Sequence, residues 1–251
     1  MIKKALLLLL LSGILVDFAY SQAPTPLPLP RLTLGVDRAE NPEDVALSLQ
    51  ILFVITILTL APSIMIMMTS FTRIIIVLHF LKQAMGSQQM PPGQVIIGMA
   101  LFMTFVVMSP VFKDVNDNAL QPYLNNQITQ DSAFTRGVEP FRNFMFKYTR
   151  EDDLALFVRY SDQDKPMNRE EISTLTLIPA FGLSELKTGF QMGFLLFIPF
   201  LMIDMIVSSI LMSMGMMMLP PAFVSLPFKI LLFILVDGWH LIVETLIKSF
   251  I

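Results

Sequence analysis

Two carboxylates lie inside strongly apolar segments, where an ionisable side chain either does chemistry or holds structure together. Asp204 lies in "PFLMIDMIVSS" and Asp237 lies in "ILVDGWH". A carboxylate near the centre of a bilayer costs about 3 kcal/mol or more, so it normally faces protein or water. Pairing with a basic side chain at a subunit interface is one explanation, and a proton relay for a small-molecule or ion transporter is the other. The candidate bases are Lys229, Arg73 and Lys82.

Other catalytic chemistry has little support in the sequence. The chain has no cysteine, which excludes disulfides, thiolate metal sites and cysteine nucleophiles. It has two histidines, and His240 and Glu244 are one helical turn apart, so they could hydrogen-bond, but a third metal ligand is missing. No nucleophile elbow, phosphate loop or zinc motif is present. We therefore expect no enzyme activity, no cofactor and no metal, and the net charge of −3 indicates no nucleic-acid partner.

A run of methionines is the third notable feature. Methionine is unbranched and polarizable, so it packs against irregular surfaces. From the residues alone, filling of a helix–helix core is the favoured explanation, and a deformable seal is the alternative. Copper(I) binding is disfavoured because histidine and cysteine are absent nearby. The methionines are Met214, Met216, Met217 and Met218, and the residues that should bend or end the helix around them are Gly215, Pro220 and Pro221.

The elements that carry these residues are those of a membrane protein. Of 251 residues, 54% are hydrophobic and 15% are charged, and the mean hydropathy is +0.67. In soluble domains, roughly a quarter of the residues are charged. Long apolar runs combined with few charges therefore predict an all-α protein with membrane-spanning helices.

The chain divides into five regions. The first has two lysines, an apolar stretch and small residues, which is typical of a secretory signal cleaved between Ser21 and Gln22. A proline-rich linker follows. Two apolar regions, expected to be long helical hairpins, flank a polar and partly helical region. The regions are 1–21, 22–44, 45–113, 114–187 and 188–251.

Apolar periodicity predicts the helices within these regions. In the first apolar region the expected helices are 45–68, 72–85 and 94–112. In the second, arms 190–219 and 223–250 should fold about the two prolines, which would bring Asp204 opposite Asp237.

The polar region is expected to form short helices that present aromatic side chains such as Phe144 and Phe157. Near its end, Pro179 and Gly182 should make a turn, after which Ser184 and Glu185 would cap a helix.

Charge supports an orientation for these regions. Twelve acidic and seven basic residues lie from Asp114 to Glu185, whereas the loops that connect the apolar helices carry only basic residues. The preference of basic loops for the cytoplasm places the polar region on the opposite side of the membrane, which the family resemblance described below implies is the periplasmic side of a bacterial inner membrane.

Four segments resemble a known family. These segments are "TRIIIVLHFLKQAMGSQQMPPGQVIIGMALFMTFVVMSPVF" (72–112), "PAFGLSELKTGFQMGF" (179–194), "MGMMMLPP" (214–221) and "LVDGWHLI" (235–242). They are similar to the FliP family of flagellar type III export-gate proteins, over about residues 45–251. The signal and the large polar region resemble the flagellar branch more than the shorter injectisome relatives.

The resemblance implies a function and an architecture. Family members are core subunits of a protein-export pore in the flagellar basal body, and they assemble, expected here in five copies, into a closed helical cone. The implied partners are FliR, FliQ, FlhB, FlhA, the assembly factor FliO and unfolded export substrates. The resemblance also implies that Met216, Met217 and Met218 form a gasket in the pore, with Met214 a weaker member. It further implies intersubunit contacts by Glu185, beside the aromatic contacts expected of Phe144 and Phe157.

Overall fold

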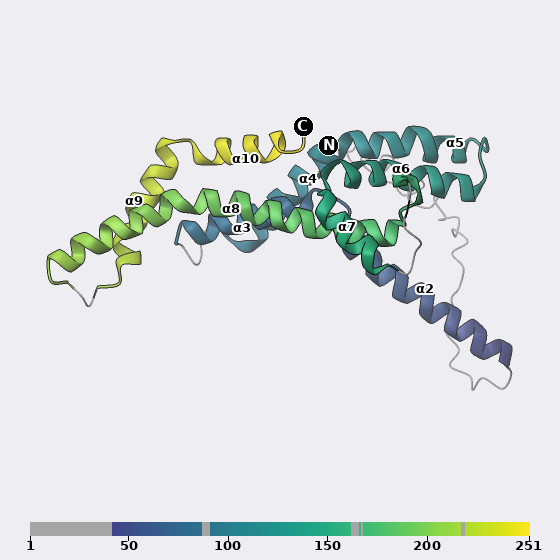
Figure 1. Ribbon diagram of the computed structural model, residues 1–251, viewed down its shortest axis with the longest axis horizontal. Helices are drawn as coiled ribbons and strands as arrows, with labels where there is room; N and C mark the ends of the chain where they lie inside the picture. The colour runs from purple at the N-terminus through teal and green to yellow at the C-terminus, as the bar shows by residue number, and fades with distance from the viewer. Residues whose placement is uncertain (1–41, 87–90, 162–165, 167, 217–218) are drawn as a thin grey trace, which may run out of the picture. The chain divides into compact units, whose positions relative to one another are not determined.

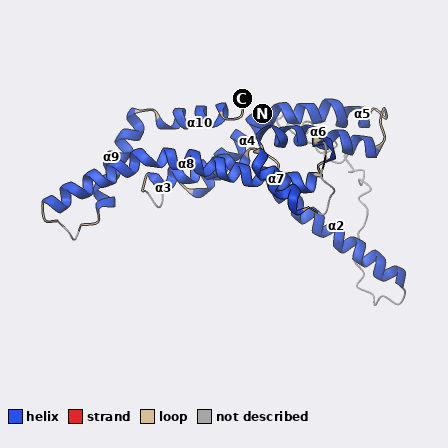
Figure 2. Ribbon diagram, viewed as in Figure 1, coloured by secondary structure: helices blue, strands red, loops and turns tan. Residues whose placement is uncertain are grey.

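The computed structural model describes residues 42–251 except 87–90, 162–165, 167 and 217–218. The chain divides into two units, residues 1–52 and 53–251. The second unit contains all the described helices except the first turns of one helix that begins in the first unit. Every regular element in the described part is a helix, as expected (Figure 2). The signal region, its cleavage position at Ser21 and Gln22, and nearly all of the proline-rich linker lie outside the described residues.

The helices of the first apolar region lie close to their predicted positions. They are α2 (Pro42–Met67), α3 (Phe71–Ala84) and α4 (Gly93–Val115). The predicted linker ended at residue 44, but α2 already begins at Pro42. Apolar runs and the proline–glycine break between α3 and α4 were sufficient to locate these helices because such breaks cannot continue a helix.

The polar region is helical over most of its described length. A π-helical turn (Asn116–Leu120) continues α4 and leads into α5 (Gln121–Leu124). Two amphipathic helices follow, α6 (Gln130–Tyr148) and α7 (Glu151–Tyr160), and then a short 3₁₀ turn (Arg169–Glu171).

The longest helix was not predicted at its true length. α8 runs without a break from Thr174 to Ser213, and Ser173 caps it by accepting a hydrogen bond from the Leu175 amide. The expected turn at Pro179 and Gly182 is therefore wrong, and the predicted boundary between residues 187 and 188 falls inside a helix. Pro179 lies early in α8, where its missing amide removes one intrahelical bond without ending the helix.

The last part of the chain is broken into two helices. α9 (Pro221–Leu235) and α10 (Gly238–Lys248) are bent by 63° with respect to each other. The predicted single return arm over residues 223–250 is therefore wrong. The break falls at Asp237, which has a left-handed backbone with φ of 48°, a conformation that most L-residues avoid.

Two hydrophobic clusters hold these helices together. The larger one contains buried side chains of α3, α4, α8, α9 and α10, and within it α3 and α8 form the most extensive helix pair (Figure 1). Their close approach depends on glycine, because a Cβ on Gly193 would lie 2.6 Å from the ring of Phe80. The smaller cluster joins α4, α6 and α8 around Met108, Met145 and Phe181.

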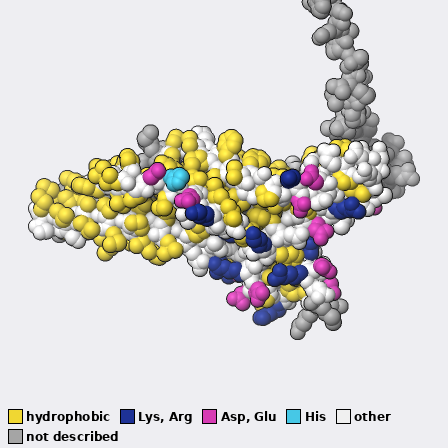
Figure 3. Space-filling model, turned by 90° about the horizontal axis from the view of Figure 1, so that it is seen from above, with side chains coloured by type: hydrophobic (Ala, Val, Ile, Leu, Met, Phe, Trp, Pro, Cys, Tyr) yellow, Lys and Arg dark blue, Asp and Glu magenta, His cyan; other side chains and the backbone are white. Residues whose placement is uncertain are grey.

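Much of the apolar surface remains uncovered in a single chain. Exposed large hydrophobic side chains extend along α2, α4, α8 and α9. On the face drawn in Figure 3, hydrophobic side chains cover most of one end, and acidic and basic side chains gather toward the other. This uncovered surface fits lipid or neighbouring subunits rather than water.

Candidate functional site

The methionine loop, residues 214–220, connects α8 to α9. α8 ends at Ser213, and Gly215 adopts a left-handed backbone with φ of 76°. The Gly215 amide donates to the Met212 carbonyl at 3.1 Å and the Met216 amide donates to the Leu211 carbonyl at 3.0 Å. This is the usual arrangement in which a glycine terminates a helix. The prediction that Gly215 interrupts the helix is confirmed.

The two prolines restart the chain as a helix. Pro220 occupies the position before α9, and Pro221 is its first residue, where the absence of an amide proton costs nothing. Met214 is 64% exposed and Met216 is 46% exposed. Met217 and Met218 lie outside the described residues. The described part of the loop therefore presents unburied thioether side chains between two apolar helices.

A partly buried ion pair connects α8 to α9. Lys229 Nζ lies 2.6 Å from Asp204 Oδ2 and also donates to the Ala84 carbonyl at 3.1 Å. Ser225 Oγ donates to the other carboxylate oxygen of Asp204 at 2.5 Å. Lys229 is 4% exposed. The carboxylate of Asp204 thus finds its basic partner within the same chain, and the lysine ties both helices to the end of α3.

The expected alignment of Asp204 with Asp237 is wrong. Asp204 lies at the level of Lys229, and Phe200 packs on Phe233 with ring centroids 6.4 Å apart. Asp237 lies beyond the end of α9, at the break before α10. The structure therefore does not bring Asp204 and Asp237 together as a pair of acids.

A second buried ion pair joins α3 to α8. Arg73 Nε donates to Glu185 Oε2 at 3.0 Å, and a second guanidinium nitrogen contacts Oε1. Arg73 is 4% exposed and Glu185 is fully buried. The expected capping role of Glu185 is wrong, because the residue lies inside α8 and its carboxylate is occupied by a bidentate arginine contact.

The same guanidinium also holds the segment that follows α10. Arg73 Nη1 donates to the Ser249 carbonyl at 3.0 Å, and the guanidinium carbon lies 3.9 Å from the ring centroid of Phe250. Tyr148 donates its hydroxyl proton to the Phe250 carbonyl. A single arginine thereby connects α3, α8 and the segment after α10.

The remaining candidate residues lie at separate positions and do not form a common site. Phe144 packs on the rings of Tyr148, Phe181 and Phe250 of the same chain. Phe157 is half-buried on α7. Within the described part of the chain, no side-chain hydrogen bond or ion pair is found for Lys82 or Asp237. Glu244 forms an ion pair with Lys248 at 2.7 Å and not the predicted hydrogen bond with His240.

One polar cluster was missed by the sequence reasoning. Asp153 on α7 is buried and accepts hydrogen bonds from the Ser184 hydroxyl at 2.8 Å and from Lys187. The Arg150 amide in turn donates to Ser184 Oγ at 3.0 Å. Burial disfavours the charged form of Asp153, but the hydrogen bonds from Lys187 and Ser184 outweigh it and lower the pKa of this carboxyl. Only the Ser–x–x–Lys spacing on α8 hinted at such a cluster.

The helices define the class of protein. Among the described residues, three helical segments are long and apolar enough to cross a membrane, 48–67, 93–124 and 174–213, and the bent pair α9–α10 is a possible fourth. The chain thus has the character of a helical membrane protein with buried ion pairs between its helices. The FliP family model matches residues 54–246, and the chain belongs to the FliP family.

Individual relatives match over most of their length. The chain is 53% identical to the flagellar biosynthetic protein FliP of Bacillus subtilis over 86% of this chain and 98% of the relative. It is 44% identical to the protein of the same name from Aquifex aeolicus over 99% of both chains. The Pectobacterium carotovorum relative is 53% identical over 81% of this chain and 79% of its own length.

Proposed function

We propose that this chain is a pore-forming subunit of the flagellar type III protein export gate in the bacterial inner membrane. Its relatives are named flagellar biosynthetic proteins, and its helices suit a membrane. The observation that carries the proposal is the methionine loop, where Met214 and Met216 are exposed around a left-handed glycine. An apolar loop of this kind needs a partner, and other copies of the same loop provide one.

The loop seals the pore when no substrate passes. Several copies bring Met214, Met216, Met217 and Met218 together around one axis, where their flexible side chains close a hole of irregular outline. An apolar constriction also excludes ions by dewetting. α8 ends at Ser213 and α9 begins at Pro221, so the loop between them can be displaced by an unfolded substrate while both helices keep their internal hydrogen bonds.

The Asp204–Lys229 and Arg73–Glu185 ion pairs position the loop. Lys229 joins Asp204 on α8 to the end of α3, and Arg73 joins α3 to α8 near its beginning. Glu185 is enclosed by its own chain, so we assign it an indirect role in assembly through the placement of α3. Phe157, half-buried on α7, is the better candidate for a direct contact between subunits.

Membership of the FliP family supports a proposal for the assembly and its setting. The subunit forms a homo-oligomer, for which we propose five copies, together with FliR and FliQ, and it works with FlhB, FlhA and FliO. The polar region lies on the periplasmic side, and energy for export comes from other components of the apparatus.

The seal is tested by replacing Met216, Met217 and Met218 together by alanine. Co-purification with the partner subunits first establishes that the complex assembles. We then expect a large ion leak across the inner membrane, measured as loss of membrane potential, because alanine leaves the constriction open.

Three other methionines serve as the control. Met202, Met205 and Met212 are all exposed on α8 outside the loop, so their joint replacement by alanine removes the same side chains from a different place. No leak from an assembled loop variant, or an equal leak from the control, refutes the seal and leaves membership of the flagellar apparatus untouched.

A further inference from the structure

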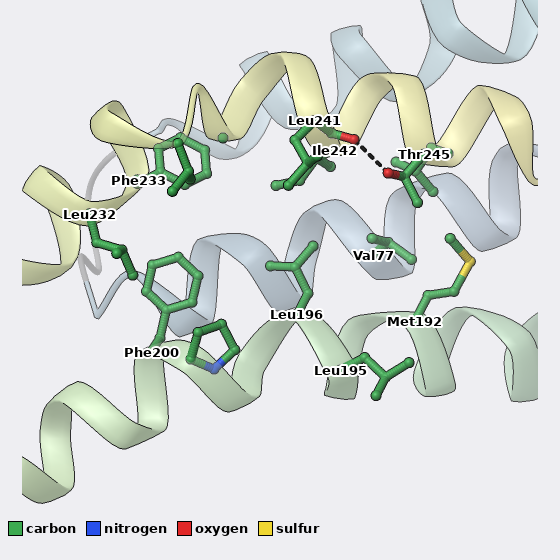
Figure 4. A pocket seen from close by; sticks show the side chains of 14 residues that line it. Val77, Met192, Leu195, Leu196, Phe200, Leu232, Phe233, Leu241, Ile242 and Thr245 are labelled. Atoms are coloured by element: carbon green, nitrogen blue, oxygen red, sulfur yellow. Dashed lines mark hydrogen bonds between the residues drawn. The ribbon is translucent and has the colours of Figure 1, made fainter.

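A half-enclosed apolar cavity lies among α3, α8, α9 and α10. Its volume is about 510 Å³. The floor is formed by the buried side chains of Val77, Phe200 and Phe233, and Leu195 and Leu241 are exposed at the mouth. Figure 4 shows side chains of α8 and of α10 pointing toward each other across this space, with Val77 of α3 between them. The cavity thus opens along the seam between α8 and α10.

The break between α9 and α10 creates this space. A Cβ on Gly238 would lie 2.2 Å from the ring of Phe233, so only glycine lets the ring enter the cavity wall. The rings of Phe233 and Trp239 form a T-shaped contact with centroids 5.3 Å apart. The 63° bend then carries α10 across α8 instead of continuing the line of α9.

The side chains that line the cavity favour an apolar ligand. Thr245 supplies the only side-chain hydroxyl among the fourteen lining residues, and it donates to the Leu241 carbonyl at 2.6 Å (Figure 4). No other side chain that lines the cavity carries a hydrogen-bonding group. The volume lies within the range of about 300–1,000 Å³ that is usual for small-ligand sites. A ligand with polar groups inside this space would lose hydrogen bonds to water without replacement.

The outer face of α10 indicates the depth of the cavity in the membrane. His240, Glu244 and Lys248 recur every fourth residue and lie on the side opposite the buried Ile242 and Leu246. A helix with one charged and one apolar face can lie in the plane of a bilayer at the level of the headgroups. The fifteen residues of α9 span roughly 22 Å, less than a hydrocarbon core of about 30 Å. With α10 at that level, the cavity mouth opens just below the lipid headgroups.

We propose that this cavity binds one acyl chain of a membrane phospholipid, whose headgroup lies beside His240, Glu244 and Lys248. The acyl chain matches an apolar space that opens toward lipid. The ion pair of Glu244 with Lys248 presents one charge of each sign to a headgroup that carries both a phosphate and an amine. A bound chain would fill the gap at the α9–α10 break and fix α10 against α8. The proposal rests on the cavity and the helix break, and it does not depend on the export function.

The protein carries its own reporter, because Trp239 is its single tryptophan and contacts Phe233 in the cavity wall. The full-length chain in detergent micelles is titrated with phosphatidylcholine that carries a dibrominated acyl chain. Bromine quenches tryptophan fluorescence only at short range. We expect quenching of Trp239 that saturates with lipid and is reversed by the unbrominated lipid.

Two matched substitutions locate the site. Thr245→Phe fills the cavity, and Ser209→Phe is its control, because Ser209 is also exposed on an apolar helix and also donates to the carbonyl four residues earlier. We expect the saturable quenching to disappear in Thr245→Phe and to persist in Ser209→Phe. Leu195→Phe at the cavity mouth provides a second test should Thr245→Phe fail to yield folded protein.

Three outcomes would overturn the proposal. Quenching that rises without saturation indicates only contact with bulk micellar lipid. Saturable quenching that survives both Thr245→Phe and Leu195→Phe places the lipid elsewhere. A Trp239 emission that depends on protein concentration and not on lipid shows that a second copy of the chain occupies the seam.

Discussion

Arg73 and Glu185 illustrate how charge is accommodated inside an apolar protein. Both side chains are buried, and the guanidinium contacts the carboxylate, the Ser249 carbonyl and the ring of Phe250 at once. Each hydrogen-bonding group that leaves water must find a protein partner, because an unpaired buried charge costs several kcal/mol. Loss of one partner from these contacts should therefore destabilise the fold strongly, because it leaves the other partner buried and unpaired.

Replacement of Glu185 by alanine leaves Arg73 buried without its counter-ion. We expect the free energy of unfolding to fall by about 3–5 kcal/mol, measured by equilibrium unfolding of the purified chain in a denaturing detergent. Glu244→Ala removes a carboxylate from an exposed ion pair and serves as the control, with little change expected. Equal stability of the Glu185→Ala variant and the parent chain would show that the pair contributes nothing.

The Asp204–Lys229 pair yields a different prediction. We expect Asp204→Ala to reduce the amount of assembled complex more than it reduces transport per complex, because Lys229 then loses its partner between three helices. The measurement compares the yield of purified complex with secretion normalised to that yield. Full assembly accompanied by defective transport would argue instead that Asp204 acts directly in conduction.

At the scale of elements, the sequence predicted helices well and their contacts poorly. The apolar runs and the Pro–Gly break located α3 and α4, and Gly215 with the two prolines located the methionine loop, because these are local signals. The ion pair of Arg73 with Glu185 joins residues 112 positions apart, and no local pattern specifies such a pair. Pro179 led to the wrong prediction of a turn, because proline occurs both in turns and near the start of long helices and the local sequence does not distinguish the two.

The α3–α8 contact depends on the absence of a side chain at Gly193. We expect Gly193→Ala to lower the free energy of unfolding by about 1–3 kcal/mol, since its Cβ would lie 2.6 Å from the ring of Phe80. Gly98→Ala is the matched control on α4, where a Cβ would meet nothing within 4 Å. There the higher helix propensity of alanine should raise stability slightly. A Gly193→Ala variant as stable as Gly98→Ala would contradict the observed packing.

The contact between α7 and α8 should depend on pH. The pKa of Asp153 is lowered by its hydrogen bonds, despite burial. A carboxyl with a lowered pKa stabilises the fold above its unfolded-state value of about 4, and this contribution disappears as the pH falls below that value.

Thermal unfolding between about pH 3 and pH 6 tests this dependence. We expect the parent chain to lose stability toward low pH and Asp153→Asn to be less stable at pH 6 with a shallower dependence. Asp152→Asn, at the exposed neighbouring position, should follow the parent chain. Parallel curves for all three proteins would show that Asp153 does not titrate with folding.

For the whole molecule, the arrangement across the membrane is the main open prediction. Three described helical segments meet the requirements of a span, and the bent pair α9–α10 is a possible fourth. The charge distribution of the loops predicts a periplasmic polar region and a cytoplasmic end of α3. The absence of cysteine in the sequence makes this orientation accessible to labelling.

Single cysteines at Thr135 and Gln83, both exposed positions, report on the two sides. In cells with a permeabilised outer membrane, a membrane-impermeant maleimide should label Thr135→Cys directly. It should label Gln83→Cys only after the inner membrane is also opened. The reverse pattern would invert the topology, and immediate labelling of both would place the two positions on one side.

The long separation of the Arg73 partners affects how the protein is made. Arg73 is synthesised 112 residues before Glu185 and 176 residues before Ser249. At about 5–20 residues per second, the ribosome takes roughly 6–22 s to supply the carboxylate. During that interval Arg73 lacks its counter-ion, which opposes its burial in an apolar environment. The final packing of α3 therefore waits for the synthesis of α8, and until then the nascent chain must keep the guanidinium of Arg73 in a polar environment.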